Sequence, residues 1–134
     1  MKFERPLPAF FSYTHRDRRH LDTLMEYMAA FRLRGDVDNW DDREIRAGQE
    51  WEDVLLDRAR KSRLFLLLIT SRFMASPYCI AVELQIARNL YDRRLAAIAP
   101  VHVENCDYEI DGLRDLKLIR PFGKPVSDSK RDRS

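Results

Sequence analysis

The sequence predicts a doubly wound α/β domain, in which helices cover both faces of a parallel sheet of roughly five strands. Apolar segments of strand length alternate along the chain with segments whose apolar residues recur at helical spacing. The strand segments are apolar throughout rather than at every second position, which is typical of strands buried on both faces of a sheet. A chain of 134 residues is the right size for one such domain with a single core.

The first half of the chain contains two strand segments and one helix. The apolar run at residues 8–13 predicts a buried strand. Apolar side chains at helical spacing over residues 21–31 predict a helix that Gly35 ends. Residues 36–40 are compatible with a short second strand, and residues 41–50 form a charged loop.

The second half continues the alternation. The strongest strand prediction is the continuous Leu/Ile run at residues 63–70. The other expected elements are a helix at 51–59, a helix at 76–90, a strand at 95–104, a helical turn at 111–116 and a last strand at 117–122. We therefore expect a domain over residues 1–126, followed by a disordered tail or the start of a linker at 127–134, which has no apolar residue.

Composition narrows the class of function. The net charge is only +2, which argues against nucleic-acid binding by charge alone. The sequence has no apolar run of the ~20 residues that a membrane helix needs, and no secretory signal at its start. Two cysteines form no disulfide framework, and no Cys/His spacing suggests a metal site. We therefore expect a cytoplasmic protein without a metal, a membrane partner or a nucleic-acid partner.

The helix at 76–90 carries an unexpected carboxylate. At 100° per residue, Gln85, Arg88 and Asn89 mark a polar face, and Glu83 projects nearly opposite its centre, beside Cys79. Ligands of doubly wound sheets gather at the carboxyl ends of the strands, and this helix begins beside that rim. Glu83 is therefore a candidate functional residue. The alternative is a carboxylate tied to a buried backbone group or an arginine.

The sequence lacks the motifs of several common binding sites. No G-x-G-x-x-G or G-x-x-x-x-G-K-[ST] pattern is present to cradle a phosphate. The segment DVDNWDDREIRA resembles a calcium loop only faintly, since Trp40 and Ala47 stand at ligand positions. The first strand ends in Ser12 and Tyr13 rather than in the paired acids of a receiver domain.

Three segments of this chain together resemble Toll/interleukin-1 receptor (TIR) domains. AFFSYTHRDRRHLDTL is similar to the family's first strand and helix, and WDDREIRAGQEW to its BB loop in the bacterial form. SRLFLLLITSRFMASPYCIAVELQIA resembles the third strand and the following helix, including a Tyr-Cys-x-x-x-Glu segment. The segments occur in the family's order, and the resemblance covers residues 8–122. It implies a flavodoxin-like sheet.

TIR domains come in two kinds, so the resemblance implies two alternatives. Some cleave NAD at the nicotinamide–ribose bond with a glutamate on the helix after the third strand, and Glu83 matches that glutamate. Others are non-catalytic scaffolds or adaptors that only assemble, and a third, weaker option is a mimic that binds host TIR domains. We expect the enzyme of the bacterial type, with NAD as its substrate and no separate cofactor.

The resemblance also assigns residues around the nucleotide. Tyr13, Thr14 and His15 match positions that border the site, although some enzymatic relatives have cations where Thr14 and His15 stand. Arg46 matches a pocket-lining position of the BB loop, and Cys79 is expected to be a wall residue rather than a nucleophile. Two of these residues also have a structural interpretation. His15 can be a polar residue that begins a helix, and Arg46 can be a solvated loop residue.

The expected activity is hydrolysis of NAD to nicotinamide and either ADP-ribose or a cyclic isomer, and the sequence does not decide between these products. The resemblance implies activation by self-association through TIR–TIR contacts. It also implies a role in immune or antiviral defence with a fused or separate sensor module.

Overall fold

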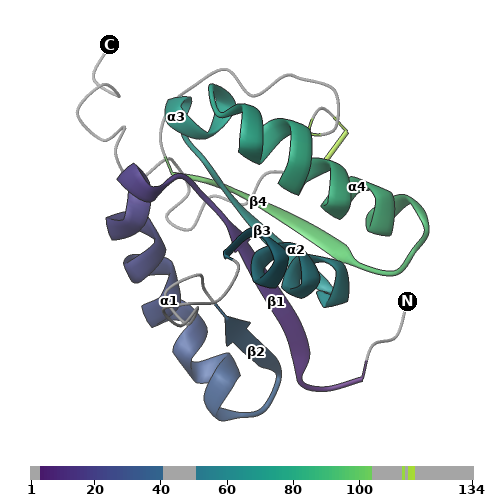
Figure 1. Cartoon of the computed structure of the whole chain (residues 1–134). Coiled ribbons are helices and arrows are strands. Elements are labelled where there is room, and N and C mark those ends of the chain that lie inside the picture. The colour runs from purple at the N-terminus through teal and green to yellow at the C-terminus, as the bar shows by residue number, and fades with distance from the viewer. Residues whose placement is uncertain (1–3, 41–50, 104–112, 114, 117–134) are drawn as a thin grey trace.

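The computed structural model of this chain describes residues 4–40, 51–103, 113, 115 and 116. Strands and helices alternate from the first strand to the last (Figure 1). The elements are β1 (Leu7–Ser12), a 3₁₀ turn (His15–Asp17), α1 (Arg18–Leu33), β2 (Val37–Trp40), α2 (Trp51–Lys61), β3 (Leu64–Ile69), α3 (Ser71–Met74), a π-helical segment (Cys79–Glu83), α4 (Leu84–Asp92) and β4 (Ala97–His102).

The four strands form one parallel sheet in the order β2-β1-β3-β4. This is the flavodoxin-like order, in which the chain changes direction across the sheet between β1 and β3. The expected doubly wound fold is therefore confirmed, with four described strands rather than five. The predicted turn at 111–116 is described only in part. The charged loop at 41–50, the last strand at 117–122 and the tail at 127–134 lie outside the described residues.

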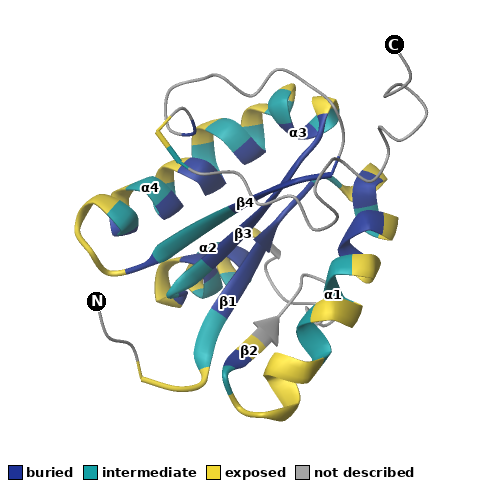
Figure 2. Cartoon of the chain, turned by 180° about the vertical axis from the view of Figure 1, so that it is seen from behind, coloured by how far each residue is buried: buried dark blue, intermediate teal, exposed yellow. Residues whose placement is uncertain are grey.

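Alternation along the strands divides the core into two clusters, one on each face of the sheet. Phe10 of β1 and Phe65 of β3 lie on the face of α2 and α4, with ring centroids 5.8 Å apart. Phe11 and Leu66 lie on the face of α1, where they pack with Leu21. Figures 1 and 2, seen from opposite sides, show α1 covering one face of the sheet and α2 and α4 the other.

The helix predicted at 76–90 differs from expectation in its first turns. A separate short helix, α3, precedes it, and residues 79–83 are π-helical before regular α-helix begins at Leu84. From there Leu84, Ala87 and Leu90 are buried, while Gln85 and Asn89 are exposed, as predicted. None of the helices in the described ranges is long and apolar enough to cross a membrane.

Helix α1 ends in a Schellman motif around Gly35. The amide of Gly35 donates to the carbonyl of Arg32 at 3.0 Å, and the amide of Asp36 to the carbonyl of Phe31 at 2.9 Å. Gly35 has φ +77°, a left-handed conformation that a residue with a Cβ adopts only at a cost.

Gly35→Ala is expected to destabilise the fold by about 1 kcal/mol, or about 4 °C in Tm. No atom lies within 4 Å of an added Cβ, so the cost is conformational rather than steric. Gly35→Asn is the matched control, because asparagine tolerates this conformation better. Thermal unfolding in which both variants lose equal stability would contradict this explanation.

Candidate functional site

The site begins where β1 and β3 end, at the carboxyl rim of the sheet. Ser12, the last residue of β1, pairs with Leu67 of β3. Because Ser12 follows Phe10 by two positions, its side chain lies on the same face of the sheet, toward α4. This is the point where strand order reverses, and ligands of open α/β sheets bind at such points.

Glu83 is buried at this rim, with only 6% of its surface exposed. The Ser12 hydroxyl donates a hydrogen bond to Glu83 Oε1 at 2.5 Å. The inward orientation predicted from helical spacing is therefore confirmed. The Ser12 hydroxyl is thus one fixed partner of the carboxylate.

The π-helical segment explains how Glu83 and Leu84 are both buried although they are adjacent in sequence. The amide of Leu84 donates to the carbonyl of Cys79, five residues earlier. This wider turn inserts one extra residue, so that the carboxylate and the first core residue of α4 both face the sheet. Segments of this kind inside helices occur often at functional sites.

Cys79 lies one turn before Glu83 and is almost fully buried. Burial raises the pKa of its thiol to about 11. Hydrogen bonding with Ser76 and Ser12 opposes this rise, whereas the negative charges of Glu83 and Asp17 add to it. The thiol is thus protonated at neutral pH, and a protonated thiol is a poor nucleophile. The role of Cys79 as a wall residue stays a prediction.

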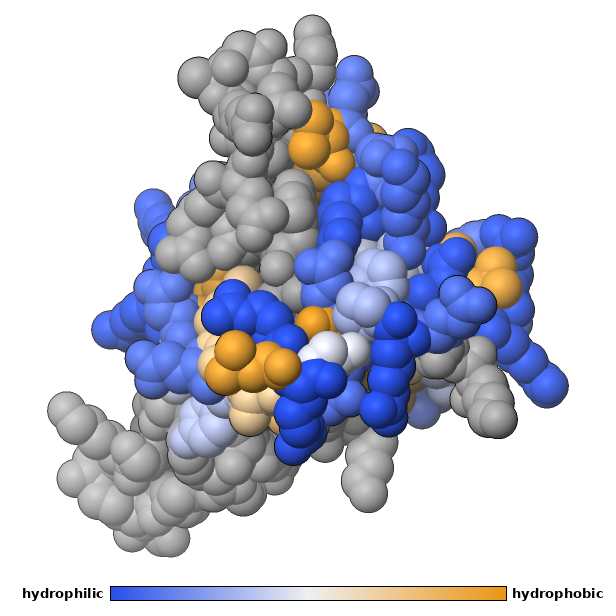
Figure 3. All heavy atoms as spheres, turned by 90° about the horizontal axis from the view of Figure 1, so that it is seen from below, coloured by the Kyte–Doolittle hydropathy of each residue, from blue (hydrophilic) through white to orange (hydrophobic). Residues whose placement is uncertain are grey.

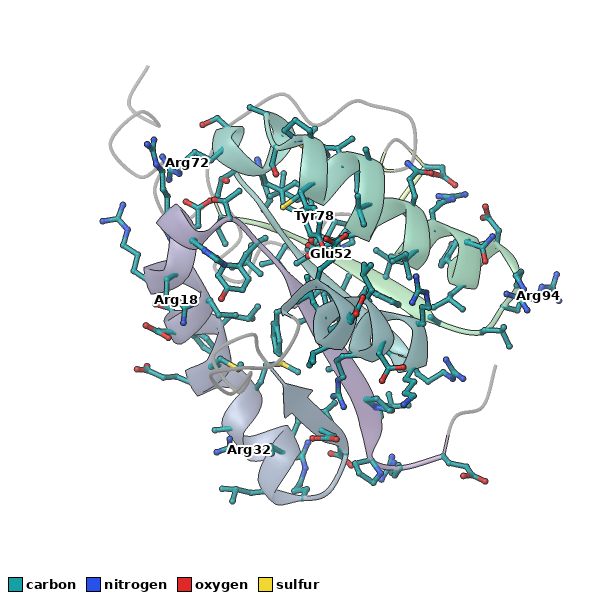
Figure 4. All side chains as sticks on the ribbon, in the orientation of Figure 1. Arg18, Arg32, Glu52, Arg72, Tyr78 and Arg94 are labelled. Carbon is teal, nitrogen blue, oxygen red and sulfur yellow. The ribbon has the colours of Figure 1, made fainter. Side chains whose placement is uncertain are left out.

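The phenol of Tyr78 lies near Glu83 and Cys79, whose charges affect its pKa. Burial, followed by the charges of Glu83, Glu52 and Cys79, raises its pKa to about 12. Figure 4 shows Tyr78 close to Glu52 of α2, between that helix and the π-helical segment. Tyr78 therefore stays protonated and can donate its hydroxyl proton.

A second buried carboxylate, Asp17, ties the two strand ends together. It is fully buried and accepts hydrogen bonds from Thr14 and Thr70, each at 2.7 Å. Arg72 donates to its other oxygen from Nε at 2.8 Å and from a terminal nitrogen at 2.5 Å. Thr70 also accepts from the amide of Phe73 and so caps α3.

The Asp17 carboxyl has a lowered pKa. Burial alone would raise this pKa, but hydrogen bonds from Arg72, Thr70 and Thr14, together with the charge of Arg72, more than offset it. Asp17 is therefore ionised at neutral pH. It holds Arg72, whose side chain is 36% exposed, at the rim of the sheet.

For the other predicted residues around the first strand end, the structure gives contacts with residues other than Glu83. Tyr13 packs in the cluster on the α1 face, and its hydroxyl accepts a hydrogen bond from Arg18 at 2.8 Å. His15 is exposed in the 3₁₀ turn, with its ring centroid 6.0 Å from that of Tyr13. Thr14 faces Asp17. Their contact with a nucleotide stays a prediction, and Arg46 lies outside the described residues.

Sequence reasoning missed Asp17, Thr70 and Arg72. Asp17 stands in the charged run HRDRRH, where an exposed side chain is the usual expectation. Its partners Thr70 and Arg72 lie 53 and 55 residues further along the chain, so no local pattern joins them. Of the three residues, Thr70 alone had a recognisable sequence signal. A threonine directly after a strand segment is a common N-cap of a following helix.

Fold and site together define a doubly wound domain with a buried glutamate at the switch point of the sheet. A family model described as "TIR domain" matches residues 9–133, and the chain belongs to this family. It is 30% identical over 118 residues to the uncharacterized protein y4lF of Sinorhizobium fredii. The match covers 88% of this chain but 36% of that relative, so the chain spans about a third of the relative's length.

Asp17→Asn is expected to destabilise the domain by roughly 2–3 kcal/mol at pH 7, because it leaves Arg72 without its counter-ion. A lowered native pKa stabilises the fold above the unfolded pKa of about 3.9, and that stability disappears as pH falls through the native pKa. Urea unfolding of both proteins from pH 7 to pH 3 should show their difference shrink below about pH 4.

The matched control is Asp57→Asn, which removes an exposed carboxylate paired with Lys61 at 2.9 Å. Exposed pairs contribute little, so this variant should stay within about 0.5 kcal/mol of the parent. A gap between Asp17→Asn and the parent that is independent of pH would contradict the ionised assignment.

Proposed function

We propose that this TIR domain hydrolyses NAD, with Glu83 as the catalytic carboxylate. The observation that carries the proposal is a glutamate buried at the carboxyl rim of the sheet, held by Ser12 on a π-helical turn. An apolar residue would pack at this position at lower cost in free energy than a carboxylate. A buried charge at a ligand-binding edge is therefore a candidate functional group.

The proposed reaction breaks the bond between the ribose C1′ and the nicotinamide nitrogen. The bond's electron pair goes to the pyridinium ring, so nicotinamide leaves neutral and needs no proton from a general acid. Positive charge develops on the ribose, in a transition state like that of glycoside hydrolysis. Water then attacks C1′, loses a proton and gives ADP-ribose, whereas attack by another atom of the substrate gives a cyclic isomer.

Glu83 suits this chemistry because a fixed negative charge stabilises a developing positive charge most strongly where water is excluded. Ser12 holds the carboxylate in place, so that little reorganisation is required during the reaction. Arg72 provides a half-exposed cation at the same rim, where the sequence has Thr14 and His15 rather than cations. Its ion pair with Asp17 fixes its position, from which it could donate hydrogen bonds to the diphosphate of NAD.

The second candidate is a non-catalytic assembly domain. The bond between Ser12 and Glu83 supports it, because a satisfied buried carboxylate can also serve packing alone. The length of the relative suits either function, since a TIR domain within a longer chain can be joined to a sensor module. In both cases we propose assembly through TIR–TIR contacts and a role in defence.

Glu83→Gln is expected to lower NAD cleavage by about 10²–10³-fold, because it removes the charge that would face the oxocarbenium ion. The amide oxygen of glutamine can still accept from Ser12, so we expect the variant to fold. Nicotinamide release by concentrated protein, followed by chromatography together with the nucleotide product, measures the loss.

Glu26→Gln, on the exposed face of α1, is the matched control and should cleave NAD at the parental rate. Parental activity in folded Glu83→Gln would refute the catalytic assignment. A folded parent protein without any NAD cleavage, whatever its concentration, would favour the assembly domain instead.

Specific activity is expected to rise with protein concentration. A nucleotide at the rim is shielded from water only when a neighbouring molecule or a closed loop covers it, and shielding strengthens the interaction with Glu83. A hundredfold dilution series, assayed for nicotinamide release alongside light scattering, tests this dependence. Constant specific activity over the series would show that the single domain is sufficient.

A further inference from the structure

We propose that a basic hollow at the opposite end of the sheet binds a compact anion with two phosphoryl groups. The hollow, of about 510 Å³, lies between the start of β1, the α2–β3 connection and the α4–β4 turn. Its charged lining consists of Arg5, Lys61, Arg63, Arg94 and Glu4, so cations outnumber carboxylates. Arg94 lies across the molecule from the rim residue Arg72 (Figure 4).

Two of these cations already have carboxylate partners. Arg5 pairs with Asp36 at 3.0 Å, and Lys61 pairs with Asp57 at 2.9 Å. Arg63 donates to the carbonyl of Ser62 at 3.0 Å, and this acceptor carries no formal charge. Within the part of the chain that the structure describes, no carboxylate forms an ion pair with Arg63 or Arg94.

The C-termini of α2 and α4 also lie at this end, and each contributes roughly half a negative charge. Cations at helix ends often only balance this dipole. Here Arg63 stands just before β3 rather than in a helix, so its charge is not part of either helix end. Arg63 and Arg94 are therefore the two guanidinium groups of the hollow that can bind an anion.

The backbone of Arg94 supplies an independent observation. Arg94 has φ +60° and occupies the same Schellman position after α4 that Gly35 occupies after α1. Its amide donates to the carbonyl of Tyr91 at 2.9 Å, and the amide of Leu95 to that of Leu90 at 2.8 Å. Glycine is the usual residue here, so an arginine strains the backbone while its side chain lines the hollow. Strain of this kind points to a use for the side chain.

Size and donor geometry define the ligand. A hollow of about 510 Å³ falls in the range of small-molecule sites and exceeds what one phosphate fills. The planar guanidinium groups of Arg63 and Arg94 can each bind a phosphoryl group through two hydrogen bonds. The described surface seen from below, from the end where β1 begins, is mainly hydrophilic with small hydrophobic patches (Figure 3). This surface suits a charged ligand better than an apolar one.

The test is calorimetric titration of the full chain with pyrophosphate, paired with NMR mapping of backbone amides. We expect saturable binding that shifts amides near Arg63 and Arg94, and at least tenfold weaker binding by the double variant R63Q/R94Q. The double variant R19Q/R32Q on α1 removes the same charge elsewhere and should bind as the parent does. A parallel titration with ADP distinguishes a nucleotide source, which binds more tightly than pyrophosphate, from an inorganic one, which does not.

Three results would overturn the proposal: unchanged affinity in R63Q/R94Q, equal affinity for monophosphate, or shifts confined to the rim around Thr14 and Thr70. The last result would place the anion at the proposed NAD site. Binding is measured without turnover, so an inactive protein that still binds pyrophosphate at the hollow refutes only the proposed hydrolase.

Arg94→Gly tests separately the backbone strain at this position and the binding of an anion by the side chain. Relief of the left-handed strain should raise Tm by about 4 °C, while pyrophosphate binding weakens at least fivefold. A variant that loses stability, or that gains it and binds pyrophosphate as the parent does, would show that Arg94 is not retained for an anion.

Discussion

The arrangement of the rim depends on the ion pair between Asp17 and Arg72. Asp17 follows β1 and Arg72 follows β3, so this pair and the two threonine hydroxyls fix one strand exit against the other. The strands themselves hydrogen-bond only as far as Ser12 and Ile69. Beyond those residues the polar network around a fully buried carboxylate replaces the ladder of the sheet. Such a network is rigid when every member is satisfied.

The π-helical segment connects the Asp17 network to Glu83. Thr70 caps α3 and binds Asp17, so the start of the segment between β3 and α4 is held by the same network. From there the wider turn brings Glu83 to Ser12, at the end of β1. The two buried carboxylates are thus connected through neighbouring elements, and Cys79 lies where both charges affect its pKa. A change at Asp17 can therefore alter the position of Glu83 without touching it.

Periodicity predicted much of this structure. The apolar runs located the strands, helical spacing located α1, α2 and α4, and the inward orientation of Glu83 followed from the same spacing. The π-helical turn was not predictable, because its pattern of burial over five residues resembles an ordinary helix face. Alternation could have placed Tyr13 with Phe11 on the α1 face, since two residues separate them. The Asp17 network joins residues far apart in sequence, and local patterns contain no information about such pairs.

The free energy of burial bears on the choice between enzyme and scaffold. Removing a carboxylate from water costs several kcal/mol, and hydrogen bonds repay this cost only in part. Asp17 repays it through an arginine and two hydroxyls, which is a structural solution. Glu83 accepts a hydrogen bond from the Ser12 hydroxyl and lies next to Leu84, a residue of the apolar core. In a scaffold this carboxylate would serve packing alone, and its charge would have no further use. A reaction that develops positive charge at the rim does gain from it, and this difference favours the enzyme.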